Sequence, residues 1–328
     1  MSSRARLRFR LPASPSGEAS RGAGTALGDR VLFGLCALAG LLAVFILVEV
    51  VYQVIHGAGP SISHFGIGFI GHAAWVPNFG RFGAAAALFG TAVSSLMALV
   101  IAAPLGIAIA LYLAMMAPPA VRTIVGPLVE MLAAIPSVIV GFWGVDVLAP
   151  FASRHLEPFL HSTLGFIPLF GPPQTTGLSL FSAGLVLALM VLPIVAALSR
   201  DLFLTVPTEL TDGAAALGAT PWEIIRGVVL PTTASGVAAA TVLGLGRALG
   251  EAIAVLQVVG DGSGINHSLF APGITLASRI ANEFQTPDNR LDIPSLFYLA
   301  LILLAIGLAT SVLARWIGSR FDVHRTLA

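Results

Sequence analysis

Two charged residues, Arg247 and Glu251, lie within a long apolar stretch, in the segment GLGRALGE. Placing either charge alone at the centre of a bilayer costs about 3 kcal/mol on insertion scales. Because residues four apart share one face of an α-helix, the two side chains can form an ion pair. Guanidinium offers planar, permanently charged donors that suit an oxyanion. We interpret Arg247 as an anion contact and Glu251 as the group that restrains it.

Three glycines surround this pair, namely Gly244, Gly246 and Gly250. Glycines 246 and 250 are spaced so that another helix can approach closely, which predicts a protein-facing surface. A second interpretation stays open: the ion pair could be a structural latch that fixes packing between subunits. Buried ion pairs add little net stability over apolar packing, which favours the functional interpretation.

The composition is that of a membrane protein that crosses the bilayer several times. Of 328 residues, 56% are hydrophobic and 10% are charged, and the mean hydropathy is +0.92. All 17 basic residues are arginines, so a phosphate-binding loop ending in Gly-Lys-Ser/Thr cannot occur and any ATP hydrolysis requires another subunit. The arginines are dispersed and predict no nucleic-acid partner. We expect no cofactor or metal ion in this chain.

The apolar segments predict an all-α protein with about six transmembrane helices. A bilayer core of roughly 30 Å needs about 20 apolar residues in a helix. The expected spans are residues 31–55, 87–116, 124–150, 179–198, 233–259 and 294–317. The connecting regions are a disordered tail (1–30), a periplasmic loop (56–86), a cytoplasmic coupling loop (199–232) and a cytoplasmic tail (318–328), and residues 87–317 form the core.

Arginines in the connecting segments, together with Arg315 at the end of the last span, favour one side of the membrane. By alternation of the spans, twelve arginines lie on the side of the termini and four on the other. The positive-inside rule therefore predicts cytoplasmic N- and C-termini.

The segment VPTELTDGAAALGATPWEIIRGVVLP, residues 206–231, is too polar to span and too patterned to be disordered. It predicts a helix from Thr208, a left-handed stop at Gly218, and a second helix opened by a capping box between Thr220 and Glu223. We expect the second helix to end before Pro231. This would be a stiff element at the cytoplasmic face, and an interfacial hairpin over lipid headgroups is the alternative.

This segment resembles the cytoplasmic motif through which permeases of ABC importers bind their ATPase subunits. The family pattern is Glu-Ala-Ala, three residues, Gly, nine residues, Ile, one residue and Leu-Pro. The matching positions here are Asp212, Gly213, Ala214, Gly218, Val228, Leu230 and Pro231. The spacing is intact, with Asp for Glu, Gly for the first Ala, and Val for Ile.

Five segments in register resemble the PstC-type permeases of bacterial phosphate importers. They are residues 89–113, MLAAIPSVIVGFWGVDVLAP (131–150), VLPIVAALSRDLF (191–203), ALGATPWEIIRGVVLP and GLGRALGEAIAVL. The resemblance implies a type I (MetI-like) permease fold and transport of inorganic phosphate. It also implies three partners: a PstA-type permease, a dimeric PstB-type ATPase that holds ATP and Mg, and a PstS-type phosphate-binding protein.

Other classes fit the sequence less well. Sulfate, molybdate or another tetrahedral oxyanion remains an alternative substrate, and an ion-coupled secondary transporter would have no use for residues 206–231. An intramembrane serine protease would need a histidine at membrane depth, yet all seven histidines fall outside the expected spans. Glu130 and Asp146 are expected to have structural roles near the ends of one span, and Pro104, Pro136 and Pro193 are expected to kink their helices.

Overall fold

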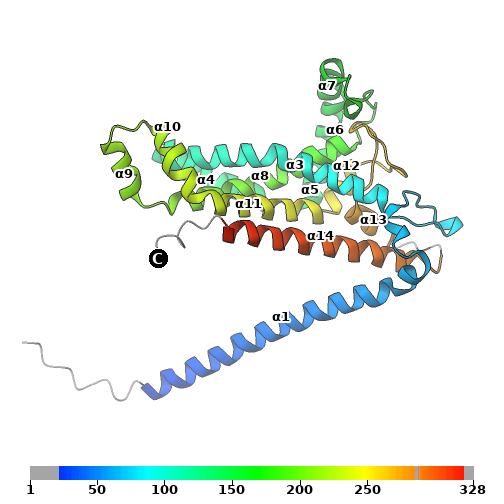
Figure 1. Ribbon diagram of the computed structural model, residues 1–328, viewed down its shortest axis with the longest axis horizontal. Coiled ribbons are helices and arrows are strands. Elements are labelled where there is room, and N and C mark those ends of the chain that lie inside the picture. The colour runs from blue at the N-terminus through cyan, green and yellow to red at the C-terminus, as the bar shows by residue number, and fades with distance from the viewer. Residues whose placement is uncertain (1–21, 285–286, 288, 321–328) are drawn as a thin grey trace, which may run out of the picture. The chain divides into compact units, whose positions relative to one another are not determined.

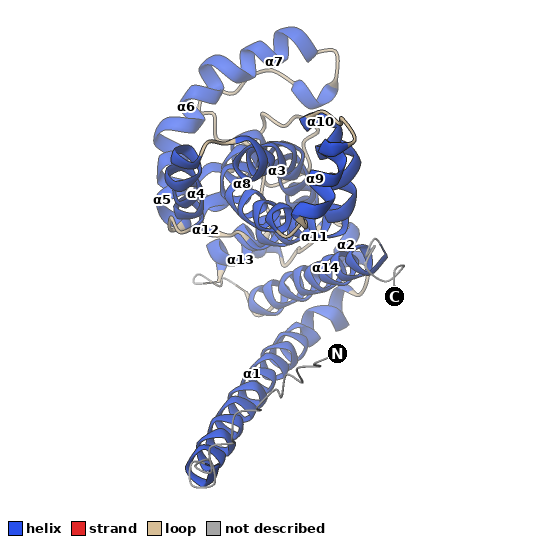
Figure 2. Ribbon diagram, turned by 90° about the vertical axis from the view of Figure 1, so that its left-hand side faces the viewer, coloured by secondary structure: helices blue, strands red, loops and turns tan. Residues whose placement is uncertain are grey.

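The computed structural model describes residues 22–284, 287 and 289–320. Secondary structure in this part of the chain is helical, apart from one isolated bridge between Val76 and Arg81 (Figure 2). The chain divides into two units, residues 1–53 and 54–328, which are described separately. Five helices are long and apolar enough to cross a membrane, or six when one bent pair is counted as a span.

The first unit consists of most of helix α1 (Gly22–Phe65). Its apolar part covers Gly28–Phe65. The expectation of a disordered tail over residues 1–30 is therefore corrected for residues 22–30, which are helical; residues 1–21 lie outside the described part. Extending an existing helix requires no new nucleation, so a moderately apolar segment can join the span.

The second unit is built on four long helices that lie side by side: α3 (Ala85–Leu111), α8 (Leu180–Leu204), α11 (Leu230–Gly250) and α14 (Asp292–Arg320) (Figure 1). α8 is the most buried of the candidate spans. Its residues Val186, Val191 and Val195 pack against Ala98 and Ala102 of α3. Small side chains on α3 let the two helices approach closely.

The third expected span, 124–150, is not one straight helix. α4 (Pro119–Ala133) is followed by a 93° bend, after which a helical run continues from Ser137 to Leu164. That run contains α5 (Ser137–Trp143), α6 (Ala149–Phe151) and α7 (Glu157–Leu164), joined by two π-helical turns. Pro136 lies at the bend, as predicted, because proline lacks an N–H group and disfavours a helical conformation in the residue before it. Pro104 and Pro193 lie inside continuous helices.

One end of the bundle is closed by short, ordered elements. These are α2 (Gly68–Gly71), a 3₁₀ turn at Pro77–Phe79 and α13 (Leu276–Glu283). Trp75 Nε1 donates a hydrogen bond to Glu283, whose other oxygen lies 2.5 Å from Arg279. Arg279 also lies over the Trp75 ring, 5.4 Å from its centroid. The end that carries α7 and α13 is therefore structured.

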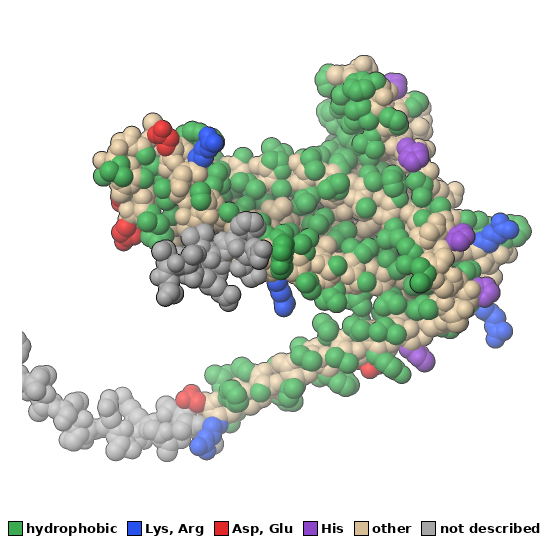
Figure 3. Space-filling model, in the orientation of Figure 1, with side chains coloured by type: hydrophobic (Ala, Val, Ile, Leu, Met, Phe, Trp, Pro, Cys, Tyr) green, Lys and Arg blue, Asp and Glu red, His purple; other side chains and the backbone are tan. Residues whose placement is uncertain are grey.

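The opposite end of the bundle carries α9 (Thr208–Ala216) and α10 (Pro221–Ile224) (Figure 1). Hydrophobic side chains cover the visible flank between the two ends, and most charged and histidine side chains in view lie toward the ends (Figure 3). This distribution is typical of helices in contact with lipid. α14 continues to Arg320, so the expected tail begins later than residue 318, and residues 321–328 lie outside the described part.

Candidate functional site

The helix that carries Arg247 ends inside the bundle. α11 stops at Gly250, and Glu251 has an extended backbone with φ −74° and ψ 118°. A short helix, α12 (Ile253–Val258), follows. The continuous helix expected over residues 233–259 is therefore wrong. Glycine is less favourable than alanine in a helix interior by about 1 kcal/mol, so continuation through Gly250 is weakly supported.

Arg247 and Glu251 form an ion pair across this break. Nη2 of Arg247 lies 3.4 Å from Oε2 of Glu251. The Arg247 side chain is 48% exposed, whereas that of Glu251 is 6% exposed. Their four-residue spacing predicted one continuous helix for both residues, but Glu251 lies at the break, as the residue that follows α11. The pair presents the guanidinium outward and keeps the carboxylate inside.

Glu251 has a second partner besides the arginine. Its Oε1 accepts a hydrogen bond from the backbone N–H of Ala254, in the first turn of α12, at 3.3 Å. Buried carboxylates require compensating donors. Because the two oxygens bind different groups, the carboxylate keeps a donor even when the guanidinium moves away. Glu251, which holds Arg247, is therefore itself held by a contact that does not involve Arg247.

The contact between Glu251 and α12 is itself supported by packing. Ala254, Val255 and Val258 of α12 are buried in one cluster with Val140 of α5 and residues of α8. A side-chain carbon added at Gly141 would lie 2.9 Å from the Cα of Ala254, so α5 and α12 approach each other closely at this glycine. The helix α12, which binds the Glu251 carboxylate through Ala254, is therefore fixed in place by its close packing against α5 and α8.

The three glycines near the pair have different surroundings. A side-chain carbon at Gly244 would meet Val191 and Val195 of α8 within 3.1 Å, so this glycine allows α11 to pack on α8. At Gly246 and Gly250, such a carbon would meet no described atom within 4 Å apart from those of the adjoining helix backbone and the neighbouring residues. The surface formed by these two glycines is open in this chain and has room for another helix.

The segment that resembles the ATPase-binding motif forms an exposed helical hairpin. Asp212, Gly213 and Ala214 lie on α9, where no side chain is buried. Gly218 has φ +86°, the left-handed conformation predicted for the turn. The capping box between Thr220 and Glu223 is also confirmed. Leu217 is 91% exposed, which leaves an apolar contact surface at this end.

The second helix of this hairpin does not end before Pro231. It runs from α10 through a π-helical turn at Ile225–Val229 into α11. Leu230 donates its N–H to Ile225, five residues earlier. A regular α-helix would set the Pro231 ring against the carbonyl of Gly227, and the wider π turn avoids this clash. The hairpin is therefore continuous with a membrane span.

An ion-pair network that the sequence did not predict lies at the same end of the bundle. Nη2 of Arg200 lies 2.6 Å from Glu130 of α4 and 2.9 Å from Asp201. Gly126 makes room for the guanidinium, because a side-chain carbon there would lie 2.9 Å from it. Glu130, for which a structural role was expected, links α4 to α8 while its side chain stays 51% exposed. Only the adjacent Arg200 and Asp201 could have suggested the network, since Glu130 lies 70 residues away.

The fold is one that ABC importers contain. The structure aligns with a chain of a bacterial alginate ABC transporter that was solved in complex with an alginate pentasaccharide-bound periplasmic protein. The TM-score is 0.59 at 17% identity, covering 90% of this chain and 98% of that one. A second structure of an alginate importer gives a TM-score of 0.53 at 19% identity, covering 88% and 98% of the two chains. At this identity the likeness establishes the fold.

The chain belongs to the family described as binding-protein-dependent transport system inner membrane component, whose family model matches residues 102–323. It is similar to a phosphate transport system permease protein PstC of Mesorhizobium japonicum, with 39% identity covering 91% of this chain and 92% of the relative. It is also 41% identical to PstC of Pasteurella multocida, covering 84% and 87% of the two chains. The protein is a multi-pass membrane subunit that serves transport.

Proposed function

We propose that this chain is the permease subunit of an ATP-driven importer of inorganic phosphate, and that Arg247 contacts the anion on its way through the membrane. The observation that carries the role of Arg247 is its half-exposed guanidinium at a helix break, paired with a buried carboxylate that has its own second donor. The choice of phosphate is supported by relatives named as phosphate permeases over most of their length.

The chemistry of the pair suits transient anion binding. Phosphate must exchange part of its hydration for protein donors, and guanidinium can contact two of its oxygens at once. A transport site must also release its ion, which requires binding that is not too tight. Glu251 competes with phosphate for Arg247 and so limits the affinity. When phosphate displaces it, the Glu251 carboxylate keeps the Ala254 hydrogen bond.

The proposal includes partners on both sides of the membrane. A PstA-type permease would complete the pathway, and a dimeric PstB-type ATPase with its own ATP and Mg would dock on residues 206–231. This chain would hold no cofactor. A PstS-type binding protein would deliver phosphate at the end that carries α7 and α13. The α9–α10 end and both termini would then face the cytoplasm of the bacterial cell, as the distribution of arginines favours.

The decisive test is Arg247→Ala in the complete transporter, reconstituted in vesicles that contain ATP. Phosphate uptake should fall to the level of empty vesicles, while the complex still purifies with all its subunits. Arg30→Ala, an exposed arginine on α1, serves as the control and should transport normally. Wild-type uptake by Arg247→Ala would remove Arg247 from the pathway.

The structural-latch alternative is favoured by the open surface at Gly246 and Gly250, which another helix could cover. The variant Arg247→Ala also distinguishes the role of anion contact from the role of structural latch. If Arg247 only joins the permeases, Arg247→Ala should lose the second permease on purification, and uptake should fall as a consequence. Competition by sulfate or molybdate against labelled phosphate tests the choice of oxyanion: an unselective permease would be inhibited by each at similar concentrations.

A further inference from the structure

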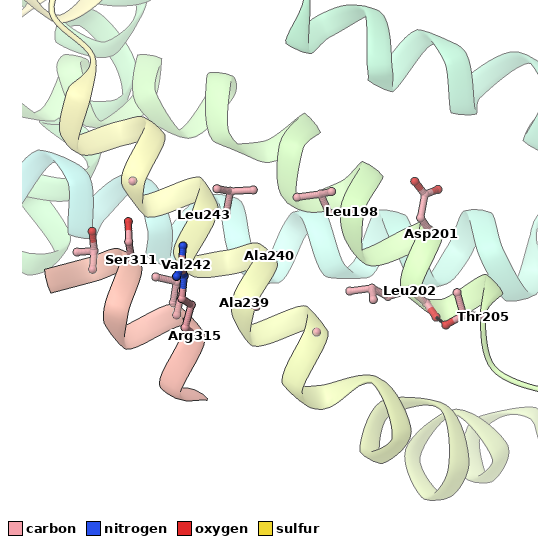
Figure 4. A pocket seen from close by; sticks show the side chains of 14 residues that line it. Leu198, Asp201, Leu202, Thr205, Ala239, Ala240, Val242, Leu243, Ser311 and Arg315 are labelled. Atoms are coloured by element: carbon pink, nitrogen blue, oxygen red, sulfur yellow. Dashed lines mark hydrogen bonds between the residues drawn. The ribbon is translucent and has the colours of Figure 1, made fainter. Parts of the chain in front are cut away.

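A cavity of about 660 Å³ opens between α8, α11 and α14 (Figure 4). Leu198, Leu202 and Leu243 contribute leucine side chains to its walls. Small residues of α11 provide its floor, namely Gly236, Ala239, Ala240 and Gly246. Its volume is in the range of small-molecule sites. A lining of this kind suits a hydrocarbon chain and does not replace the hydration of a free ion.

Arg315 of α14 supplies the charge at this cavity. Its guanidinium extends from α14 toward α11 beside Val242 (Figure 4). Within the described part of the chain it forms no ion pair. The nearby hydroxyls of Thr310 and Ser311 both donate to the carbonyl of Gly307, at 2.9 and 2.8 Å, so neither hydroxyl proton is available to another acceptor. An acidic group from outside the described part of the chain would neutralise the charge of Arg315.

The position of Arg315 is that of a residue at lipid-headgroup depth. It lies near the end of α14, next to Trp316, which is 57% exposed. Arginine and tryptophan near the end of a membrane helix meet the headgroup region. The acidic residue on the cavity wall, Asp201, is engaged by Arg200 at 2.9 Å, which offsets its negative charge.

We infer that this cavity binds one glycerophospholipid, with an acyl chain against the small residues of α11 and the phosphate group on Arg315. The carbon lining and the guanidinium match the two halves of such a molecule. A helix of another protein would fill the apolar part but would leave the guanidinium without a counter-charge unless it brought an acidic residue to the same depth. The cavity shares Gly246 with the surface beside the Arg247 pair, but neither Arg247 nor Glu251 lines it, so the inference does not rest on the proposed transport role.

The test uses the purified complete transporter, freed of lipid in detergent and titrated with palmitoyl-oleoyl phosphatidylglycerol, with bound lipid counted by native mass spectrometry. The wild type should bind one lipid tightly per copy of this chain. Arg315→Gln should weaken that binding about tenfold, the effect of losing one charge-assisted contact. Ala239→Phe, which fills the floor, should weaken it also. Arg226→Gln, an exposed arginine outside the cavity, should leave it unchanged.

Three results would overturn the inference. Lipid binding equal to the wild type in Arg315→Gln would show that the phosphate group lies elsewhere. Displacement of the lipid by millimolar sodium phosphate, with phosphate binding lost in Arg315→Gln, would make the cavity a site for the free ion. Complete cross-linking of Ala239→Cys to the second permease in native membranes would show that protein fills the cavity.

Discussion

At the residue scale, Glu251 divides its carboxylate between two partners, and each substitution should affect them differently. Oε2 contacts Arg247 at 3.4 Å and Oε1 accepts the Ala254 N–H at 3.3 Å. Glutamine keeps an acceptor for the amide but removes the negative charge. Alanine removes both contacts.

Glu251→Gln should therefore release Arg247 without disturbing α12. With its competitor gone, Arg247 should hold phosphate more tightly, so both the KM and the kcat of ATP-driven uptake should fall. Uptake measured over a range of phosphate concentrations separates the two constants. A raised KM with unchanged kcat would contradict the role of Glu251 as a competitor.

Glu251→Ala should show the same transport defect and also lower stability. It leaves the buried Ala254 N–H without its carboxylate acceptor, which costs about 1–3 kcal/mol. Thermal unfolding of the purified complex should reveal a lower Tm than for Glu251→Gln. Equal Tm values for the two variants would mean that the hydrogen bond between Glu251 and Ala254 does not contribute to the thermal stability of the complex.

At the element scale, α10 and α11 form one continuous rod interrupted by a π turn. Pro231→Ala restores an N–H and removes the ring, so a regular α-helix can run through residues 225–231 and rotate α10 relative to α11. Uptake should fall severalfold while ATP hydrolysis continues. The ratio of phosphate transported to ATP hydrolysed is the readout, with Ser235→Ala, one turn farther along, as the control. An unchanged ratio would show that the π turn has no part in coupling.

The exposed face of α9 gives a second prediction at this scale. A side-chain carbon added at Gly213 would meet no described atom within 4 Å apart from those of the adjoining helix backbone and the neighbouring residues. Gly213→Tyr should leave the fold of this chain intact and block docking of the ATPase, so the ATPase should no longer co-purify. Ala215→Tyr, which points to another side of the same helix, should retain it. Loss of the ATPase in both variants would mean that α9 tolerates no change on either side.

At the scale of the whole molecule, the apolar segments predicted the spans because hydropathy and helix length are local properties. The capping box at Thr220 and the turn at Gly218 were predictable for the same reason. The break at Glu251 was not, since it depends on the packing of α12 against α5 and α8. The link between Arg200 and Glu130 joins residues far apart in the chain, so no spacing in a single sequence reveals it.

The orientation of the chain also belongs to this scale. In a Cys36→Ser background, Phe166→Cys and Leu217→Cys place thiols at opposite ends, at residues that are 81% and 91% exposed. A membrane-impermeant maleimide applied to intact spheroplasts should label Phe166→Cys, and it should label Leu217→Cys only after permeabilisation. The reverse pattern would place the α9–α10 end outside.

The two oxygens of Glu251 have a kinetic consequence under the proposed function. When phosphate arrives, Arg247 exchanges one anion for another, and the buried carboxylate that it leaves keeps one hydrogen-bond donor, the Ala254 N–H. The loss of its counter-ion favours the return of Arg247 to Glu251, and so favours the departure of phosphate. The time that phosphate spends on Arg247 would be set by how quickly a neighbouring carboxylate, always within reach, takes the arginine back.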